Sequence, residues 1–289
     1  MTDLESPGQL VLLADNIKNK IDEYCIKEFD KGSRSHLGCS EIGKPCSRVL
    51  WYKFRNVFYK KHEPRLLRLL SRGHFEEPRF IQYLEGAGFK VTAFDEANIN
   101  AEDKGDRQIR ISACKGHFGG SIDGIGEYDG QKFLLEFKTK GTGRGFSQLS
   151  LNGCQAEAPV HYDQQCIYGY KLGLQYSVYI VINKNDDSLY IEIIKLDWNR
   201  GKELEEKAET IIFSQVPPEK IALNSKAYEC NYCDAKSVCF DNAKPLVNCR
   251  SCKNATPVEE ARWNCSLYGL IPDKEAILAA CPNWNDITK

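Results

Sequence analysis

The chain has 289 residues, of which 42% are hydrophobic and 27% charged, and its formal net charge is −1. This composition excludes a broadly disordered chain, and the lack of an apolar run of about 18 residues excludes a membrane-spanning helix. The N-terminal residues show no basic start followed by an apolar stretch, so we expect no signal peptide and a cytoplasmic location. In such a reducing compartment, clustered cysteines favour metal binding over disulfides.

The first half of the chain is predicted to be largely helical. Apolar residues recur at helical spacing over about 9–29, and a further helix start is expected near Pro45. A longer helix is expected to end near Gly86. The stretch from Lys44 to Arg79 contains ten Lys/Arg and three Glu. This excess either faces a polyanion or forms a solvated helical face.

The later elements alternate between strands and helices: strands over about 90–140, a helix over 161–173, a hairpin over 176–197 and a helix over 199–215. The character of the chain changes near residue 223, because seven of the 13 cysteines fall in the last 60 residues. We therefore expect an α/β core over 1–222, followed by a small Cys-rich, metal-binding module over 223–289.

One predicted hairpin carries charges at unusual positions. Asp129-Gly130 is a favoured two-residue type I′ loop, and that loop fixes a register in which Asp123 lies opposite Glu136, with Lys138 on the same face. Directly opposed Cβ atoms are about 5 Å apart, so two carboxylates there repel. A hard divalent metal would compensate, and a lysine beside it could position water. The alternative is an exposed strand face with scattered charges.

These residues resemble a known signature. "SID" and "EFK" are similar to the D…(D/E)xK motif of the PD-(D/E)XK nuclease superfamily, with Asp123, Glu136 and Lys138 in the motif positions. The resemblance implies a restriction-endonuclease-like mixed β-sheet core flanked by helices, and metal-dependent hydrolysis of DNA phosphodiesters. It further implies that Mg²⁺ or Mn²⁺ is held by the carboxylates and the main-chain carbonyl of Phe137.

Two helical motifs narrow the resemblance to the RecB-like and lambda-exonuclease-like branch of the superfamily. "RGHFEEP" is similar to the branch's G-h-x-x-E pattern, which assigns Glu77 to the metal, with Glu76 as the fallback and His74 as a further ligand. "DQQCIYGY" is similar to its Q-x-x-x-Y helix, which assigns Gln164 and Tyr168 as catalytic-site residues. Positions four apart share one helix face. The resemblance covers roughly residues 35–240.

Other segments that resemble the family would approach DNA. "SEIGKPCSRVLWY" is similar to the family's N-terminal segment, in which a Ser and a C-x-R unit lie near the DNA, and this assigns Ser40 and Arg48. The basic residues after the second hairpin strand, Lys140 and Arg144, would contact phosphates, as would the Lys44–Arg79 stretch. No segment is suited to reading bases, so little sequence specificity is expected.

The cysteines suggest two metal groups. "CNYCDAKSVC" is similar to the iron–sulfur motif of helicase-associated and CRISPR-associated RecB-like exonucleases. This resemblance implies a [4Fe-4S] cluster on Cys230, Cys233 and Cys239, with Cys46 as the distant fourth ligand and Cys39 as its alternative.

Four more C-terminal cysteines suit a structural Zn²⁺: Cys249, Cys252, Cys265 and Cys281. A rival partition would place Zn²⁺ on Cys230, Cys233, Cys249 and Cys252, which have zinc-ribbon spacing. The rival leaves three C-terminal cysteines without a role, so the first partition is preferred.

The resemblance as a whole implies a Mg²⁺- or Mn²⁺-dependent deoxyribonuclease that acts as an exonuclease in recombination, repair or phage DNA metabolism. The alternatives are a structure-specific endonuclease and a non-catalytic nucleic-acid-binding protein that keeps the fold. Expected partners are linear DNA and a recombination or single-strand-binding protein, with no membrane. The expected location is the cytoplasm, or the host cytoplasm if a phage encodes the chain.

Overall fold

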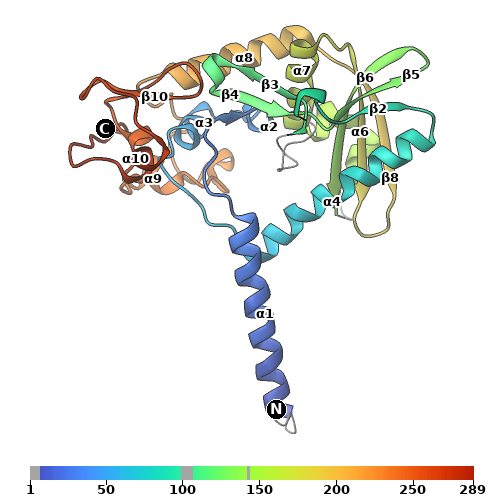
Figure 1. Cartoon of the computed structure of the whole chain (residues 1–289), viewed down its shortest axis with the longest axis horizontal. Coiled ribbons are helices and arrows are strands. Elements are labelled where there is room, and N and C mark those ends of the chain that lie inside the picture. The colour runs from blue at the N-terminus through green and yellow to red at the C-terminus, as the bar shows by residue number, and fades with distance from the viewer. Residues whose placement is uncertain (1–6, 99–106, 142–143) are drawn as a thin grey trace.

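A computed structural model describes residues 7–98, 107–141 and 144–289 (Figure 1). The helices are α1 (Pro7–Phe29), α2 (Cys39–Ile42), α3 (Ser47–Phe54), α4 (Pro64–Gly86), α6 (Arg144–Glu157), α7 (Pro159–Leu172), α8 (Trp198–Phe213), α9 (Lys236–Phe240) and α10 (Lys274–Ala279). The strands are β1 (Leu37–Gly38), β2 (Lys90–Thr92), β3 (Arg110–Ala113), β4 (Phe118–Ser121), β5 (Gly124–Tyr128), β6 (Gln131–Lys140), β7 (Tyr176–Asn183), β8 (Leu189–Lys195), β9 (Ala255–Pro257) and β10 (Trp263–Cys265).

The central sheet has the strand order β2-β5-β6-β7-β8. It is mixed, because β6 and β7 run parallel while the other neighbouring pairs run antiparallel. A smaller sheet of order β1-β4-β3 lies beside it, and β9 pairs with β10 in the C-terminal region. The predicted α/β class, with a mixed sheet flanked by helices, is confirmed.

Local sequence signals set the ends of several elements. Pro159 occupies the first turn of α7, where its missing N–H costs no hydrogen bond, and Gly173 ends that helix with φ of 70°. Asp197 caps α8 by accepting a hydrogen bond from the Arg200 N–H. Strand β7 is a continuous buried run rich in β-branched residues, which is typical of a strand covered on both faces.

The β5–β6 hairpin has the predicted register. Asp129 and Gly130 both have positive φ, 49° and 75°, as a type I′ loop requires. Tyr128 pairs with Gln131, and the ladder continues to Gly124 opposite Leu135. The next step of the same register brings Asp123 beside β6 at Glu136 and Phe137.

Strand β6 is buried on both faces. Leu135 and Phe137 pack against Phe80 and Leu84 of α4 on one face. Leu134 belongs to the larger hydrophobic cluster, which includes side chains of α7 and α8 on the other face. Glu136 therefore lies in the middle of the fold, with 1% of its surface exposed. A buried carboxylate requires compensation from a cation or from hydrogen bonds.

Helix α1 projects from the rest of the molecule (Figure 1). It occupies nearly the range predicted from its apolar spacing, but Cys25 is its only buried residue among those described. Its N-terminal half exposes apolar side chains, and its contacts are mainly with α4. No described helix, α1 included, is long and apolar enough to cross a membrane.

The C-terminal region, residues 223–289, packs directly on the core. The Trp263 ring lies 5.2 Å from the Phe54 ring of α3, centroid to centroid. Arg55 donates to the Ala255 carbonyl at 2.8 Å, and Arg250 donates to the Phe54 carbonyl. Residues of this region, among them Trp263, belong to the main hydrophobic cluster. The region and the core therefore share one apolar interior.

Candidate active site

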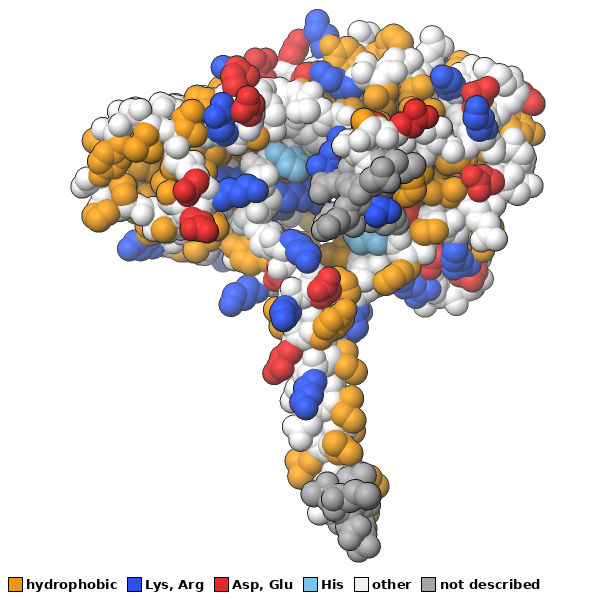
Figure 2. All heavy atoms as spheres, in the orientation of Figure 1, with side chains coloured by type: hydrophobic (Ala, Val, Ile, Leu, Met, Phe, Trp, Pro, Cys, Tyr) orange, Lys and Arg blue, Asp and Glu red, His pale blue; other side chains and the backbone are white. Residues whose placement is uncertain are grey.

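A cavity of about 790 Å³ opens between α4, β4, β6 and α7, and we call it the central cavity. Eight of the residues predicted for the catalytic or DNA site line it: Ser40, His74, Glu77, Asp123, Phe137, Lys138, Gln164 and Tyr168. Figure 2 shows a hollow near the middle of this face, with Lys, Arg and His side chains gathered around it. The fold thus brings together residues that are up to 128 positions apart, Ser40 to Tyr168.

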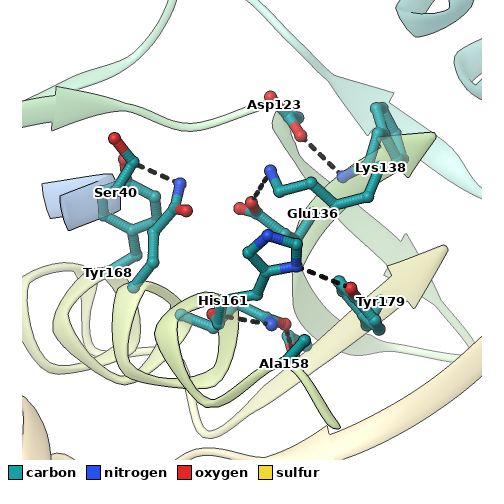
Figure 3. A network of polar contacts seen from close by, with 12 residues as sticks. Ser40, Asp123, Glu136, Lys138, Ala158, His161, Tyr168 and Tyr179 are labelled. Atoms are coloured by element: carbon teal, nitrogen blue, oxygen red, sulfur yellow. Dashed lines mark hydrogen bonds and ion pairs between the residues drawn. The ribbon is translucent and has the colours of Figure 1, made fainter. Parts of the chain in front are cut away.

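The hairpin charges form a hydrogen-bonded group (Figure 3). One carboxylate oxygen of Asp123 accepts a hydrogen bond from the Phe137 N–H at 2.6 Å. Lys138 forms an ion pair with Glu136, which lies behind it and does not line the cavity. The Lys138 side chain is 26% exposed, so its ammonium reaches the cavity while it compensates the buried Glu136.

The carboxylates around Asp123 repel one another, and the pKa values of Asp123 and Lys138 are shifted accordingly. Burial and the neighbouring Glu136 raise the pKa of Asp123 to about 7, and the charge of Glu77 acts in the same direction. Burial alone would lower the pKa of Lys138, but the charges of Glu136 and Asp123 outweigh burial and raise it. A cation bound beside Asp123 would relieve the repulsion among the three carboxylates.

Helix α4 contributes Glu77 rather than Glu76 to the central cavity. Glu76 is buried and forms ion pairs with Arg79 at 2.7 Å and Arg72 at 3.7 Å. The Glu77 carboxylate lies 3.2 Å from His74 Nδ1 on the preceding turn. The Glu77 position favoured by the G-h-x-x-E register therefore faces Asp123, while the fallback carboxylate is engaged elsewhere.

Helix α7 places Gln164 and Tyr168 on one face, as the i, i+4 spacing predicts. Gln164 Nε2 lies 3.3 Å from the Tyr168 hydroxyl, which donates to the Ser121 carbonyl at 3.0 Å. Both side chains are nearly fully buried, with 6% and 2% exposed. This chain of hydrogen bonds ties α7 to the end of β4, next to Asp123.

Gly120 is required for that contact. A Cβ atom at this position would lie 2.4 Å from the Tyr168 hydroxyl oxygen and 3.2 Å from the Cys39 Cβ. Gly120→Ala should therefore displace the Tyr168 ring and lower the free energy of unfolding by about 1–3 kcal/mol. Urea denaturation measures this change. Gly145→Ala, at a site with open space around it, is the control and should be near neutral.

Four further residues that line the central cavity were not predicted from the sequence: Arg34, His36, Arg110 and Lys184. Arg34 Nη1 lies 3.4 Å from the Ser40 hydroxyl. His161 was also given no role, yet its Nδ1 lies 2.8 Å from the Tyr179 hydroxyl, close to Lys138 (Figure 3). Burial and the charges of Lys138 and Lys140 lower the pKa of His161 to about 3, so its imidazole is neutral. None of these positions carries a motif by which sequence alone could have found it.

Other residues predicted to bind DNA lie elsewhere. Arg48 donates to the Pro218 carbonyl at 2.7 Å and does not line the central cavity. Lys140 is half-buried at the end of β6 and is also absent from the lining, and the side chain of Arg144 lies outside the described part of the structure.

The Lys44–Arg79 stretch contributes no Lys or Arg to the cavity lining. Most of its cations instead form ion pairs with carboxylates: Lys44 and Lys53 with Glu41, Lys60 with Asp234, Arg68 with Asp22, and Arg72 and Arg79 with Glu76. The local excess of positive charge is thus largely paired with carboxylates, and no Lys or Arg of this stretch is placed to contact a phosphate in the central cavity.

Another cavity, of about 380 Å³, is lined by four cysteines, and we call it the first cysteine cavity: Cys46, Cys230, Cys233 and Cys239. Arg48 and Lys220 line it too. Burial raises the pKa of Cys239, and the positive charges of Arg48 and Lys220 partly oppose that rise. Cys39 instead lines the central cavity. Cys46 and Cys39 were the two candidates for the distant fourth cysteine. The fold places Cys46, and not Cys39, in the same cavity as Cys230, Cys233 and Cys239.

The other four cysteines line a separate cavity of about 20 Å³, the second cysteine cavity: Cys249, Cys252, Cys265 and Cys281. Burial raises the pKa of Cys249, and the charges of its three partner cysteines add to the effect. All eight thiols are free of disulfides. Within the described residues, no group of three or more His, Cys, Asp or Glu is arranged as a ready-made metal site. For either group of four cysteines, or the carboxylates of the central cavity, to bind a metal, the side chains would have to move closer together.

Comparisons with known proteins give only distant likenesses. No family model matches the chain, and no curated protein matches it. A solved structure described as SSO0001 is 14% identical, with a TM-score of 0.46 over 79% of this chain and 98% of that chain. An alkaline exonuclease (LHK-Exo) from Laribacter hongkongensis is 16% identical, with a TM-score of 0.39 over 65% of this chain and 90% of that chain.

The same exonuclease in complex with dAMP is 16% identical to this chain, with a TM-score of 0.37 over 61% of this chain and 86% of that chain. Because these scores are below 0.5, they carry no argument for activity.

Proposed function

We propose that the chain is a metal-dependent nuclease that hydrolyses phosphodiester bonds of DNA in the central cavity. The observation that supports this most is the convergence of Asp123, Glu77 and Lys138 in one cavity, with Glu136 paired to Lys138 behind it. This set combines oxygen ligands suited to Mg²⁺ or Mn²⁺ with a cation near the reacting phosphate. The resemblance to PD-(D/E)XK nucleases found in the sequence assigns the same residues.

Each residue of the set has a distinct part in this proposal. Asp123 and Glu77, with the main-chain carbonyl of Phe137, would hold the divalent metal, which polarises the phosphate and lowers the pKa of a bound water. Glu136 would join them as a ligand by exchanging its ion pair with Lys138 for the metal. The Phe137 N–H fixes one oxygen of Asp123, leaving the other free to act as a ligand. Lys138, kept charged by its carboxylate neighbours, would orient the attacking water and stabilise the negative charge that develops. Gln164 and Tyr168 would position the DNA strand next to β4.

The proposed mode of action is exonucleolytic, and it is tested with purified protein on linear and covalently closed circular DNA of the same sequence. We expect Mg²⁺- or Mn²⁺-dependent release of nucleotides from the linear DNA, with the circle left intact and EDTA stopping the reaction. Cutting of the circle would replace the exonuclease proposal with an endonuclease. Binding without cleavage of either DNA would replace both with the non-catalytic alternative.

Arg34 supplies a positive charge at the mouth of the central cavity, and we propose that it contacts a DNA phosphate. Arg34→Ala should weaken DNA binding and reduce the slope of log K against log salt by about 0.9 for duplex or 0.7 for single strands. Fluorescence anisotropy of labelled DNA across a salt series measures both effects. Arg65→Ala, an exposed arginine that does not line the cavity, should leave the slope unchanged.

We also propose a [4Fe-4S] cluster in the first cysteine cavity. Four thiols, the number that such a cluster needs, share a cavity of about 380 Å³, and the positive charges of Arg48 and Lys220 in its lining would offset part of the negative charge of four thiolates. Anaerobically purified protein should be brown, with iron and acid-labile sulfide that disappear in Cys233→Ser. Colourless protein whose Cys233 binds zinc would overturn this proposal. It would leave the nuclease assignment of the central cavity untouched.

A further inference from the structure

Two buried arginines connect the C-terminal region to the core. Arg55, at the end of α3, is fully buried, and its guanidinium donates to the carbonyls of Ala255 at 2.8 Å and Ser214 at 3.0 Å. Arg250, which is 6% exposed, donates to the carbonyls of Arg34 and Phe54. Neither arginine forms an ion pair with a carboxylate among the described residues, and the Nε of each has no hydrogen-bond partner there.

Two buried cations without an anionic partner are an unusual arrangement in a protein interior. A charge removed from water is strongly unfavourable unless an opposite charge compensates it. Carbonyl oxygens supply partial negative charge only, and the two guanidiniums repel each other because they lie on the same Trp263 ring, at 5.0 Å and 5.9 Å from its centroid. An anion near this pair would compensate the two charges.

The second cysteine cavity adjoins these arginines. Arg250 lies between Cys249 and Cys252 in the sequence, within "CRSC". Ala255, whose carbonyl accepts from Arg55, and Trp263, whose ring the arginines contact, both line this cavity with the four cysteines. The Ala255 N–H in turn donates to the Cys252 carbonyl at 3.1 Å.

The volume of the second cysteine cavity, and the charge that four thiolates would carry, indicate a single metal ion as its occupant. A volume of about 20 Å³ is enough for one small particle, since a single water needs at least about 10–15 Å³, and it has no room for a cluster of several iron atoms. Four thiolates with one divalent ion have four negative charges and two positive ones, which leaves a net charge of two minus. That charge is equal in size and opposite in sign to the two positive charges of the buried guanidiniums.

We propose that Cys249, Cys252, Cys265 and Cys281 bind one Zn²⁺ as a tetrathiolate, and that this anionic site is the counter-charge of Arg55 and Arg250. Zinc suits four cysteines in a tetrahedral, closed structural site. The ion would attach the C-terminal region to α3, because the arginines bridge the metal site and the core. This proposal does not depend on the nuclease assignment.

Metal analysis of the full chain, purified anaerobically, tests the ligand set. We expect one zinc per chain, lost in Cys265→Ser and retained in the control Cys114→Ser, a half-buried cysteine outside both groups. If Cys265→Ser fails to fold, the wild-type protein reloaded with Co²⁺ should show the intense visible bands of tetrahedral cobalt with thiolate ligands. Zinc that persists in Cys265→Ser, iron at these cysteines, or cobalt spectra without thiolate bands would overturn the site.

A double-mutant comparison tests the counter-charge. Arg55→Met should weaken zinc binding at least tenfold in competition with a chromophoric chelator, while the exposed Arg65→Met should not. Arg55→Met should also lower Tm in the zinc-loaded protein, and lower it less, or raise it, in the Cys265→Ser background. The carbonyls that lose Arg55 are the same in both backgrounds, so their cost cancels. An equal shift of Tm in both backgrounds, or unchanged zinc affinity, would overturn the role of Arg55.

Discussion

Asp123→Asn is expected to reduce the rate of DNA hydrolysis about a thousandfold or more at saturating Mg²⁺. Asparagine keeps the size of the side chain but removes the charge through which Asp123 would hold the metal, and the metal supplies several kcal/mol of transition-state stabilisation. Because each 1.4 kcal/mol is worth about tenfold in rate, a loss of this size follows from weakening that single interaction. The initial rate of nucleotide release from linear DNA measures it.

Asp129→Asn is the matched control for this variant. Asp129 lies in the loop of the same hairpin, far from the cavity lining, and Asn-Gly forms the same type I′ turn. The control should therefore keep the wild-type rate. Activity of Asp123→Asn within about tenfold of the wild type would refute the assignment of the Asp123 carboxylate.

Lys138→Met should reduce the rate by about 10²–10⁴-fold, the range for a residue that assists proton transfer.

Trp263→Ala is expected to lower the free energy of unfolding by about 3–5 kcal/mol. The Trp263 ring is 2% exposed, and it packs 5.2 Å from the Phe54 ring and 5.5 Å from the His117 ring. The guanidiniums of Arg55 and Arg250 lie over the same ring. Truncation would leave a cavity at the contact between the C-terminal region and α3, and it would expose two buried cations to a looser environment.

Chemical denaturation with and without the substitution measures this effect. Tyr232→Ala is the control, because Tyr232 is an aromatic residue of the same region with 95% of its surface exposed. It should change the free energy of unfolding by no more than about 0.5 kcal/mol. A similarly small effect of Trp263→Ala would mean that the C-terminal region contributes little to the stability of the core.

The hairpin shows how much of this fold could be predicted from local sequence. Asp129-Gly130 determines both the turn type and the register, so the positions of Asp123, Glu136 and Lys138 follow from chain geometry alone. Helix α7 is similar, because its i, i+4 spacing determines that Gln164 and Tyr168 share a face. These predictions depend on neighbours in the sequence, which is why they could be made without the fold.

The features that could not be predicted depend on distant contacts or on weak local signals. Arg34 and Arg110 come to the central cavity through the small β1-β4-β3 sheet, whose parallel β1–β4 pair no local pattern indicates. Helix α6 was not predicted, since Gly, Ser and Asn dilute its apolar periodicity and Gly153 interrupts its helical dihedrals. Arg48 follows a motif, yet its guanidinium contacts Pro218, which sequence spacing could not reveal.

The cysteines lie between these cases. The resemblance to iron–sulfur exonucleases implied the division into two groups, and the fold places each group around its own cavity. The rival zinc-ribbon partition would join Cys230 and Cys233 to Cys249 and Cys252, but these two pairs line different cavities. The buried arginines beside the second group were invisible in the sequence, because an arginine between two cysteines is by itself an ordinary surface pattern.

The central claim is that the carboxylates of the central cavity hold a divalent metal for phosphodiester hydrolysis. Anomalous diffraction from crystals soaked in Mn²⁺ tests it most directly. We predict an anomalous peak bounded by Asp123, Glu136 and Glu77, next to the main-chain carbonyl of Phe137, and the loss of that peak in Asp123→Asn. A protein that cleaves DNA while its manganese lies away from these carboxylates, or a peak that survives in Asp123→Asn, would contradict this account.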